Sequence, residues 1–266
     1  MRRLIACALA VAWLGGAVSA QAQELTEEQQ VLATEFAYNN SLFVLYHEIG
    51  HLFVGEFGLP VLGKEEDAAD SLASVMLLVQ DTDESAQALI DAADGWYLTE
   101  YSGEADSWES ADFYDEHSLS IQRSYQAVCL MVGADPETFG EVADEFEMDS
   151  DRQESCAFDY QQALTSWASL LEPYEGSDGA AIEVVYEEPA EDYADIAQFL
   201  QDSEFLEGAA AWVTENYALP REVTFRAMQC DEENAYYSYD DAEITFCYEL
   251  TPYFFSLLEQ DMLSAE

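Results

Sequence analysis

The segment from Ser41 to Val79 constrains this chain most, because it carries the pattern His47-Glu48-x-x-His51 among residues of helical periodicity. Residues four apart lie on one face of an α-helix, so both imidazoles can approach one ion with Glu48 beside them. The chain has only 3 histidines in 266 residues, so this spacing has a probability below about 1% of arising from composition. The segment predicts a helix with two zinc ligands, His47 and His51, and a general base, Glu48.

A second helix should follow the first and pack against it. The glycines and proline within residues 58–63 predict that the first helix ends there and that the chain reverses. A new helix is expected from about Lys64. The small residues Gly50, Ala69 and Ala73 would allow the two helices to approach closely enough for one ion to join them.

This second helix offers the third ligand that a catalytic zinc ion needs besides its open position for water. Glu66 is the candidate, because Asp70 lies one turn further on the same face. Asp70 could therefore accept the far N–H of a ligand histidine and fix its ring. Glu65 is flanked on its own face by alanines, so we interpret Glu65 and Asp67 as ordinary acidic residues of a solvated first turn.

These motifs resemble a known family. HEIGH, followed by GLPVLG and then EEDAAD, is similar to the putative metallopeptidase family of secreted bacterial proteins, a domain of unknown function. The E-x-x-A-D stretch from Glu66 to Asp70 also resembles the second motif of gluzincin-type zinc peptidases. The resemblance implies a zincin-like domain with ligands His47, His51 and Glu66, the base Glu48, and Asp70 as a carboxylate behind the ligands.

The N-terminus has the pattern of a targeting segment. Residues 1–22 are expected to be a secretory signal, since two arginines precede an apolar run over 4–14 and a small-residue cleavage site. The run is short for a membrane span, and no other stretch is long and apolar enough to insert stably. We expect a secreted or periplasmic protein with one metallopeptidase-like domain over 23–266. A lobe boundary, if present, is expected near 172–192, which is rich in glycine, proline and acids.

The charge of the chain limits its partners. Its formal net charge is -49, so nucleic acid and anionic membrane surfaces are not expected partners. Either a saline environment screens this surplus, or it serves only the solubility of an acidic secreted protein. Hydrophobic residues make up 50% of the chain and aromatic residues 13%, which favours a folded domain over disorder.

Four cysteines follow the predicted signal: Cys129, Cys156, Cys230 and Cys247. Export favours disulfides, and four cysteines allow three pairings. We favour Cys129 with Cys156 and Cys230 with Cys247, because each pair brackets a compact local unit. Each bridge would stabilise the fold by about 3 kcal/mol. A zinc site built from all four is the competing interpretation, but neither pair has the short C-x2-C spacing.

The middle of the chain reads as mainly helical. Periodicity predicts helices over 84–100, from the residues after His117 to Met131, over 136–171 and over about 193–216. Peptide hydrolysis by zinc needs a donor for the oxyanion of the attacked carbonyl, and His117 or Arg123 could supply it. Both resemble an H-S-x-x-x-Q-R segment of the same family. The alternative is an ordinary structural role for each.

Strands are expected near the C-terminus. Alternating residues predict strands over 182–186, 223–229 and 243–248, and with 234–238 the last two would form a small antiparallel sheet. The sequence N-A-Y-Y at 234–237 is similar to the substrate-binding edge strand of the neprilysin family, although here it follows the zinc helix. The resemblance makes Asn234 and Ala235 candidate peptide-binding residues. A simple turn and strand start is the alternative.

Taken together, the sequence predicts an α+β fold, mainly α-helical, with a small antiparallel β-sheet or hairpin. The expected function is zinc-dependent hydrolysis of peptide or protein substrates outside the cytoplasm. Two alternatives stay open: a non-catalytic secreted binding protein with a structural zinc, and a zinc amidase acting on cell-wall peptides. The sequence makes no prediction of oligomeric state.

Overall fold

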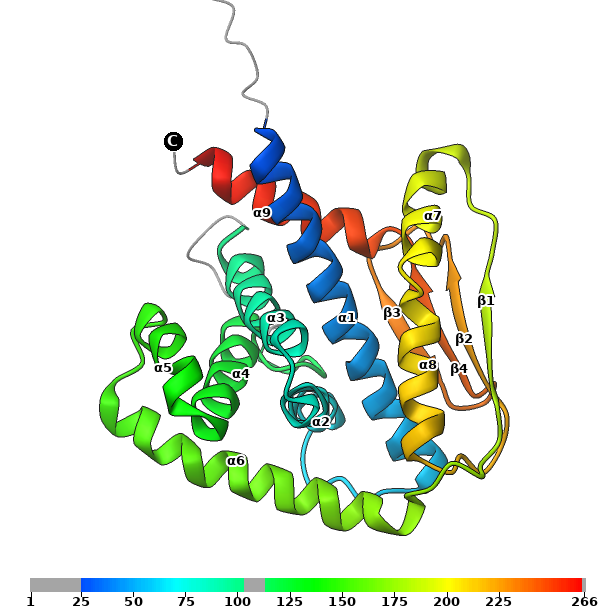
Figure 1. Ribbon diagram of the computed structural model, residues 1–266, viewed down its shortest axis with the longest axis horizontal. Helices are drawn as coiled ribbons and strands as arrows, with labels where there is room; N and C mark the ends of the chain where they lie inside the picture. Colours follow the sequence, from blue (N-terminus) through cyan, green and yellow to red (C-terminus); the bar gives the residue numbers. More distant parts are fainter. Residues whose placement is uncertain (1–24, 103–112, 265–266) are drawn as a thin grey trace, which may run out of the picture.

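The computed structural model describes residues 25–102 and 113–264, and one long helix organises it. Helix α1 (Glu27–Phe57) begins at a capping box, in which Thr26 and Gln29 exchange side-chain and backbone hydrogen bonds. It ends at Gly58, whose left-handed backbone (φ 61°) terminates the helix. Figure 1 shows α1 between a group of helices and a β-sheet, which explains why its second half is buried almost continuously. The predicted signal segment lies outside the described residues.

A group of helices packs on one side of α1 (Figure 1). Helices α2 and α3 contact α1 directly, and α4 packs on both of them. Helix α6 lies against α2 and α4, and α5 packs on α4. The predicted helix over 136–171 is interrupted near Glu147, which has a positive φ, and Asp149 then caps the next helix. The bounds are α2 (Glu65–Gln80), α3 (Asp83–Ser102), α4 (Ser120–Ala134), α5 (Pro136–Glu145), α6 (Ser150–Leu171) and a 3-10 turn (Glu172–Tyr174).

A mixed sheet of four strands lies on the other side of α1. Its order is β1-β2-β4-β3, and its strands are β1 (Ile182–Tyr186), β2 (Val223–Met228), β3 (Ala235–Ser238) and β4 (Glu243–Cys247). The neighbours β1–β2 and β2–β4 are parallel, and only β3–β4 is antiparallel. The expectation of an antiparallel sheet is therefore wrong for β2 and β4. In the sequence, β3 comes between β2 and β4 and runs antiparallel to β4, so β2 and β4 can be parallel. An alternating sequence pattern does not reveal the direction of a strand.

Two helices connect β1 to β2 and cover one face of the sheet (Figure 1). After a 3-10 turn (Glu191–Tyr193), α7 (Ala194–Asp202) and α8 (Phe205–Asn216) replace the single helix expected from 193 to 216. The break falls at Glu204, which adopts a left-handed backbone (φ 51°). Such a crossover is what two parallel neighbouring strands require. Helix α9 (Leu250–Ser264), which we did not predict, packs on α1 and α3.

Two disulfides join these elements. Cys129–Cys156 connects α4 to α6, and Cys230–Cys247 connects the segment after β2 to the end of β4. This is the pairing that the sequence favoured, and it fits a protein folded in an oxidising, extracellular compartment. Within the described ranges, none of the helices has the length and apolar character needed to cross a bilayer.

Candidate metal centre

The two motif histidines lie on the half of α1 that is buried. Leu45, Ile49 and Leu52 surround them in the sequence and are fully buried, so the core holds this part of the helix in place. His47 and His51 project from the same face because they are four residues apart. Both are nearly buried, with 4% and 7% of their surface exposed. Their rings meet edge to face, with centroids 4.8 Å apart.

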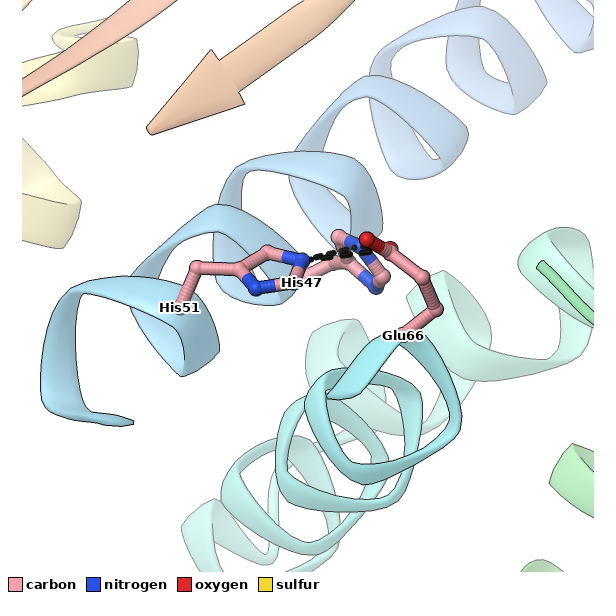
Figure 2. A group of neighbouring side chains, drawn as sticks. All are labelled: His47, His51 and Glu66. Atoms are coloured by element: carbon pink, nitrogen blue, oxygen red, sulfur yellow. Dashed lines mark hydrogen bonds and ion pairs between the residues drawn. The ribbon is translucent and has the colours of Figure 1, made fainter. Parts of the chain in front are cut away.

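Glu66 reaches the histidines from the first turn of α2. The turn over residues 58–64 reverses the chain, and α2 then crosses α1 in close contact. A Cβ added at Gly50 would lie 2.9 Å from the Cα of Ala69, so the two backbones nearly touch beside the site. Only glycine at position 50 permits this approach without displacement of one helix. Figure 2 shows the result: His47 and His51 on α1 face Glu66 on α2.

Three donor atoms converge at this point. Nε2 of His47 and Nε2 of His51 lie 3.1 Å apart, and Oε2 of Glu66 lies 3.0 Å from the first and 3.2 Å from the second. A tetrahedral zinc ion about 2.0 Å from each donor would place the donors roughly 3.3 Å apart. Within the described residues, His47, His51 and Glu66 form a group that could hold a metal ion.

Each histidine has a carboxylate on its other ring nitrogen. Nδ1 of His47 donates to Oδ1 of Asp70 over 2.7 Å, and Nδ1 of His51 donates to Oε1 of Glu65 over 2.8 Å. Since a carboxylate accepts, each Nδ1 carries the proton, and in the neutral rings each Nε2 presents a lone pair. Two lone pairs and a carboxylate oxygen therefore face one another. These three atoms, and the residues that carry them, could therefore bind a metal ion.

The pKa shifts of these side chains lead to the same conclusion. Burial alone would lower the pKa of His47, but hydrogen bonds to Asp70 and Glu66 outweigh it and raise the pKa to about 9. Burial would raise the pKa of Glu66, yet hydrogen bonds from His117, His47 and His51 hold it far below its usual range. The site thus stabilises positive charge strongly at neutral pH.

Asp70 is itself fixed by a buried arginine. Arg123 donates from Nε to Oδ2 of Asp70 (2.6 Å) and from Nη2 to Oδ1 (2.7 Å), and its guanidinium lies 3.6 Å from the ring centroid of Trp96. Burial would raise the pKa of Asp70, but the charge of Arg123 and the bond from His47 lower it strongly. The structure therefore uses two nitrogens of Arg123 to hold the carboxylate behind His47.

Glu48 lies at the wall of a cavity of about 970 Å³ that also exposes His47, His51 and Glu66. Glu48 itself is 5% exposed. Burial raises the pKa of its carboxyl, an effect that the neighbouring histidines partly offset. A carboxyl in this position can hold a proton more readily than a solvated one.

His117 borders the same cavity from the segment before α4. Its Nε2 lies 3.0 Å from Oε2 of Glu66, but it is not one of the three mutually close donor atoms. Its side chain is 47% exposed. Lys64 holds this segment, since its Nζ donates to the carbonyl oxygens of Asp115 (3.1 Å) and His117 (2.8 Å).

Strand β3 forms part of the opposite cavity wall. Asn234, Ala235, Tyr236 and Tyr237 line the cavity, and β3 contacts α1. Oδ1 of Asn234 accepts from the backbone N–H of Ala235 (2.9 Å), and its carbonyl oxygen accepts from Cys247 (3.1 Å). Strand β3 is the edge of the sheet nearest the two histidines in the cavity wall.

The roles of two residues near the site were not predicted from the sequence. We interpreted Glu65 as an ordinary solvated residue, but it accepts the Nδ1 proton of His51. Tyr239, in the turn after β3, donates its hydroxyl to the same Glu65 oxygen. The signal for Glu65 was available, because two ligand histidines need two acceptors and Asp70 serves only one. Tyr239 had no sequence signal, since its contact joins residues 174 positions apart.

Comparison with known protein families finds a match over most of the chain. The model of a family described as "Putative metallopeptidase" matches residues 9–171 and 186–265, which is most of the chain. Neither the curated proteins nor the solved structures contain a significant match to this sequence.

Proposed function

Since this chain belongs to the family described as "Putative metallopeptidase", we propose that it is a zinc-dependent peptidase of gluzincin type that acts outside the cytoplasm. One observation carries the proposal. Three donor atoms from α1 and α2 converge on the wall of a large cavity, beside the buried carboxyl of Glu48. A structural zinc site normally has four protein ligands and is closed to solvent.

The ion would be held by His47, His51 and Glu66, with Asp70 and Glu65 fixing the two rings. Zinc bound there would polarise the scissile carbonyl and lower the pKa of a coordinated water. The chain contributes an arrangement that needs little movement of these side chains, because hydrogen bonds already set the orientations of the two rings.

Glu48 is the proposed general base. Its carboxylate would take a proton from the attacking water and pass it to the nitrogen of the leaving amine. Burial raises the pKa of this carboxyl, so Glu48 can hold the proton between the two transfers. Glu48 lines the same cavity as both histidines, so a peptide bound there with its scissile bond at the metal would lie near this carboxyl.

His117 is the proposed donor to the oxyanion that develops on the attacked carbonyl. Its ring lies half-exposed at the cavity, and Lys64 fixes the backbone of its segment. We favour His117 over Arg123 for this role, because Arg123 is buried and bound to Asp70 through two nitrogens, whereas His117 is half-exposed at the cavity and its Nε2 would be released from Glu66 by a metal ion on that carboxylate. Arg123 would instead act by keeping Asp70 ionised and oriented.

Strand β3 is the proposed binding edge for the peptide. The bond from the Cys247 N–H to the carbonyl oxygen of Asn234 fixes the hydrogen-bonding pattern of β3, so the carbonyl oxygen of Ala235 and both peptide groups of Tyr237 point away from β4. An extended substrate could pair with these groups as a further strand. Asn234 would stabilise the start of this edge through its bond to Ala235. Main-chain hydrogen bonds of this kind bind a peptide without requiring a particular sequence.

Replacement of Glu48 by glutamine tests the catalytic proposal. We expect Glu48→Gln to keep its zinc, measured by metal analysis, and to lose peptide hydrolysis by roughly 10²–10⁴-fold. Exposed Glu28 of the same helix provides the control, and Glu28→Gln should change neither property. Hydrolysis that survives in Glu48→Gln would contradict the role of this residue. A panel that includes cell-wall peptides separates a peptidase from an amidase.

A further inference from the structure

The two carboxylates that fix the histidines are themselves held in different ways. Asp70 is buried and held by the charge of Arg123, as described above. Glu65 lies at the mouth of the cavity with 35% of its side chain exposed. A carboxylate in that position has water as a competitor for its hydrogen bonds. Something other than burial must fix its orientation.

Tyr239 supplies that contact. Its hydroxyl donates to Oε1 of Glu65, the oxygen that also accepts from His51 Nδ1. Burial first, and then the hydrogen bond to Glu65, raise the pKa of the Tyr239 hydroxyl, so it stays protonated and able to donate. Tyr239 also lines the cavity together with the two histidines.

The ring and backbone of Tyr239 are fixed independently of Glu65. A Cβ added at Gly55 would lie 2.7 Å from Cε1 of Tyr239, so the glycine leaves room for the ring against α1. The carbonyl oxygen of Tyr239 accepts from Nη2 of Arg221 over 2.8 Å. Arg221 also pairs with both oxygens of Glu56, at 2.8 and 2.7 Å. Tyr239 is 48% exposed, but its ring packs at Gly55 and its backbone is bound by Arg221, so contacts other than the one to Glu65 hold it against α1.

We propose that Tyr239 is a positioning residue, which holds Glu65 so that the His51 ring presents Nε2 to the metal. It also links the metal centre to β3, because it follows the last residue of that strand. This inference rests on the proposed function and deepens it. It does not require that the bound metal be catalytic.

Replacement of Tyr239 by phenylalanine tests the inference in the full-length protein. The hydroxyl is lost while the ring that packs at Gly55 is kept. We expect zinc affinity, measured by competition with a chelator, to fall about tenfold, the lower end of the range for partners behind a ligand. We also expect the visible absorption of the cobalt-substituted protein to change, because it reports the geometry of the ligands.

Tyr237→Phe is the matched control. Tyr237 lies within β3, just before Tyr239, and its ring also lies close to Gly55, but its hydroxyl donates to Glu56 over 2.5 Å. It should keep the zinc affinity and the cobalt spectrum of the wild type. An equal loss of affinity in Tyr237→Phe would overturn the proposal in favour of a general structural effect.

A double-mutant cycle identifies the route. If Tyr239 acts through Glu65, then Tyr239→Phe should have no further effect on zinc affinity in the Glu65→Ala background. A full tenfold effect in that background, or no effect of Tyr239→Phe in the wild type, would show the inference to be wrong. A protein that binds zinc but cleaves no peptide would contradict the proposed activity and leave these comparisons valid. A wild type that binds no zinc would overturn both.

Discussion

His47 and His51 are identical side chains one helical turn apart, yet their surroundings differ. His47 has a buried aspartate backed by an arginine, whereas His51 has a partly exposed glutamate backed by a tyrosine. The inner histidine is therefore held by charge in a region of low dielectric, where electrostatic interactions are strong. The outer histidine depends on a neutral hydroxyl at the cavity. The two ligands should consequently differ in how easily single substitutions disturb them.

Acidic residues that lie close together can also destabilise the folded state. Burial, and then the charges of Asp91, Glu145 and Asp261, raise the pKa of Asp94 to about 6. Its pKa in the unfolded chain should be near the ordinary 3.8. A group with a raised folded pKa favours the folded state while it is protonated, and this benefit is lost as pH rises from 3.8 to 6. At neutral pH, Asp94 therefore destabilises the fold.

Asp94→Asn should remove this penalty. We expect the free energy of unfolding at pH 7 to rise on the order of 1–3 kcal/mol, with little change at pH 4. Urea denaturation at the two pH values measures both quantities. Glu141→Gln, at an exposed position of α5, should leave stability unchanged at either pH. An equal gain for Asp94→Asn at pH 4 and pH 7 would rule out ionisation as its cause.

At the scale of elements, the site depends on the crossing of α1 and α2. The histidines belong to one helix and Glu66 to the other, so the spacing of the two backbones sets the distance between the donors. The contact of Gly50 with Ala69 fixes that spacing. On the other side of α1, β3 forms the proposed peptide-binding edge and leads into Tyr239. A single helix thus serves as the common reference for the ligands and the proposed substrate strand.

Gly50→Ala should separate α1 from α2. Because the added Cβ would meet the Cα of Ala69 at 2.9 Å, the backbone rather than a flexible side chain must move. We expect a loss of roughly 1–3 kcal/mol in unfolding free energy and weaker zinc binding. Gly208→Ala in α8 is the control, since a Cβ there meets nothing within 4 Å. It should be neutral or stabilising by up to about 1 kcal/mol. Unchanged zinc affinity in Gly50→Ala would mean that this contact does not set the donor spacing.

At the scale of the whole molecule, negative charge dominates. The sequence has 56 acidic residues and 7 lysines and arginines. Each described arginine pairs with a carboxylate of the chain itself, and Lys64 is bound to two carbonyl oxygens. The cavity is meanwhile lined by further acids, including Glu116 and Glu233. The molecule therefore offers little positive charge to an acidic substrate and a strong attraction to a basic one.

A peptidase with this charge should favour cationic peptides. We expect kcat/KM at low salt to be about 10-fold higher for a peptide with lysines flanking the scissile bond than for the same peptide with glutamates. Because salt screens such attraction, the ratio should fall towards one as the salt concentration approaches 1 M. A neutral peptide of equal length serves as the reference. If the ratio did not depend on salt, the preference would come from direct contacts with the peptide and not from the electrostatic field of the whole protein.

Much of the helical architecture could be predicted from local sequence. The breaks at Glu147 and Glu204 could not, because left-handed backbone at glutamate carries no compositional signal. Strand direction was also missed, since β3 had to be placed at the edge before β2 and β4 could be parallel. Helix α9 escaped because its residues are apolar on several sides, as suits a helix that packs on both α1 and α3.

The sequence by itself was enough to predict that His47 and His51 share one helix face with Glu48 beside them, because helix periodicity follows from backbone geometry that every chain shares. It also supplied Glu66 and Asp70 as candidates, since they too are related by one helical turn. Only the tertiary structure decided that Glu65 accepts from His51 and that Tyr239 holds Glu65. Those contacts arise where separate elements meet, and their distances depend on packing that no local pattern encodes.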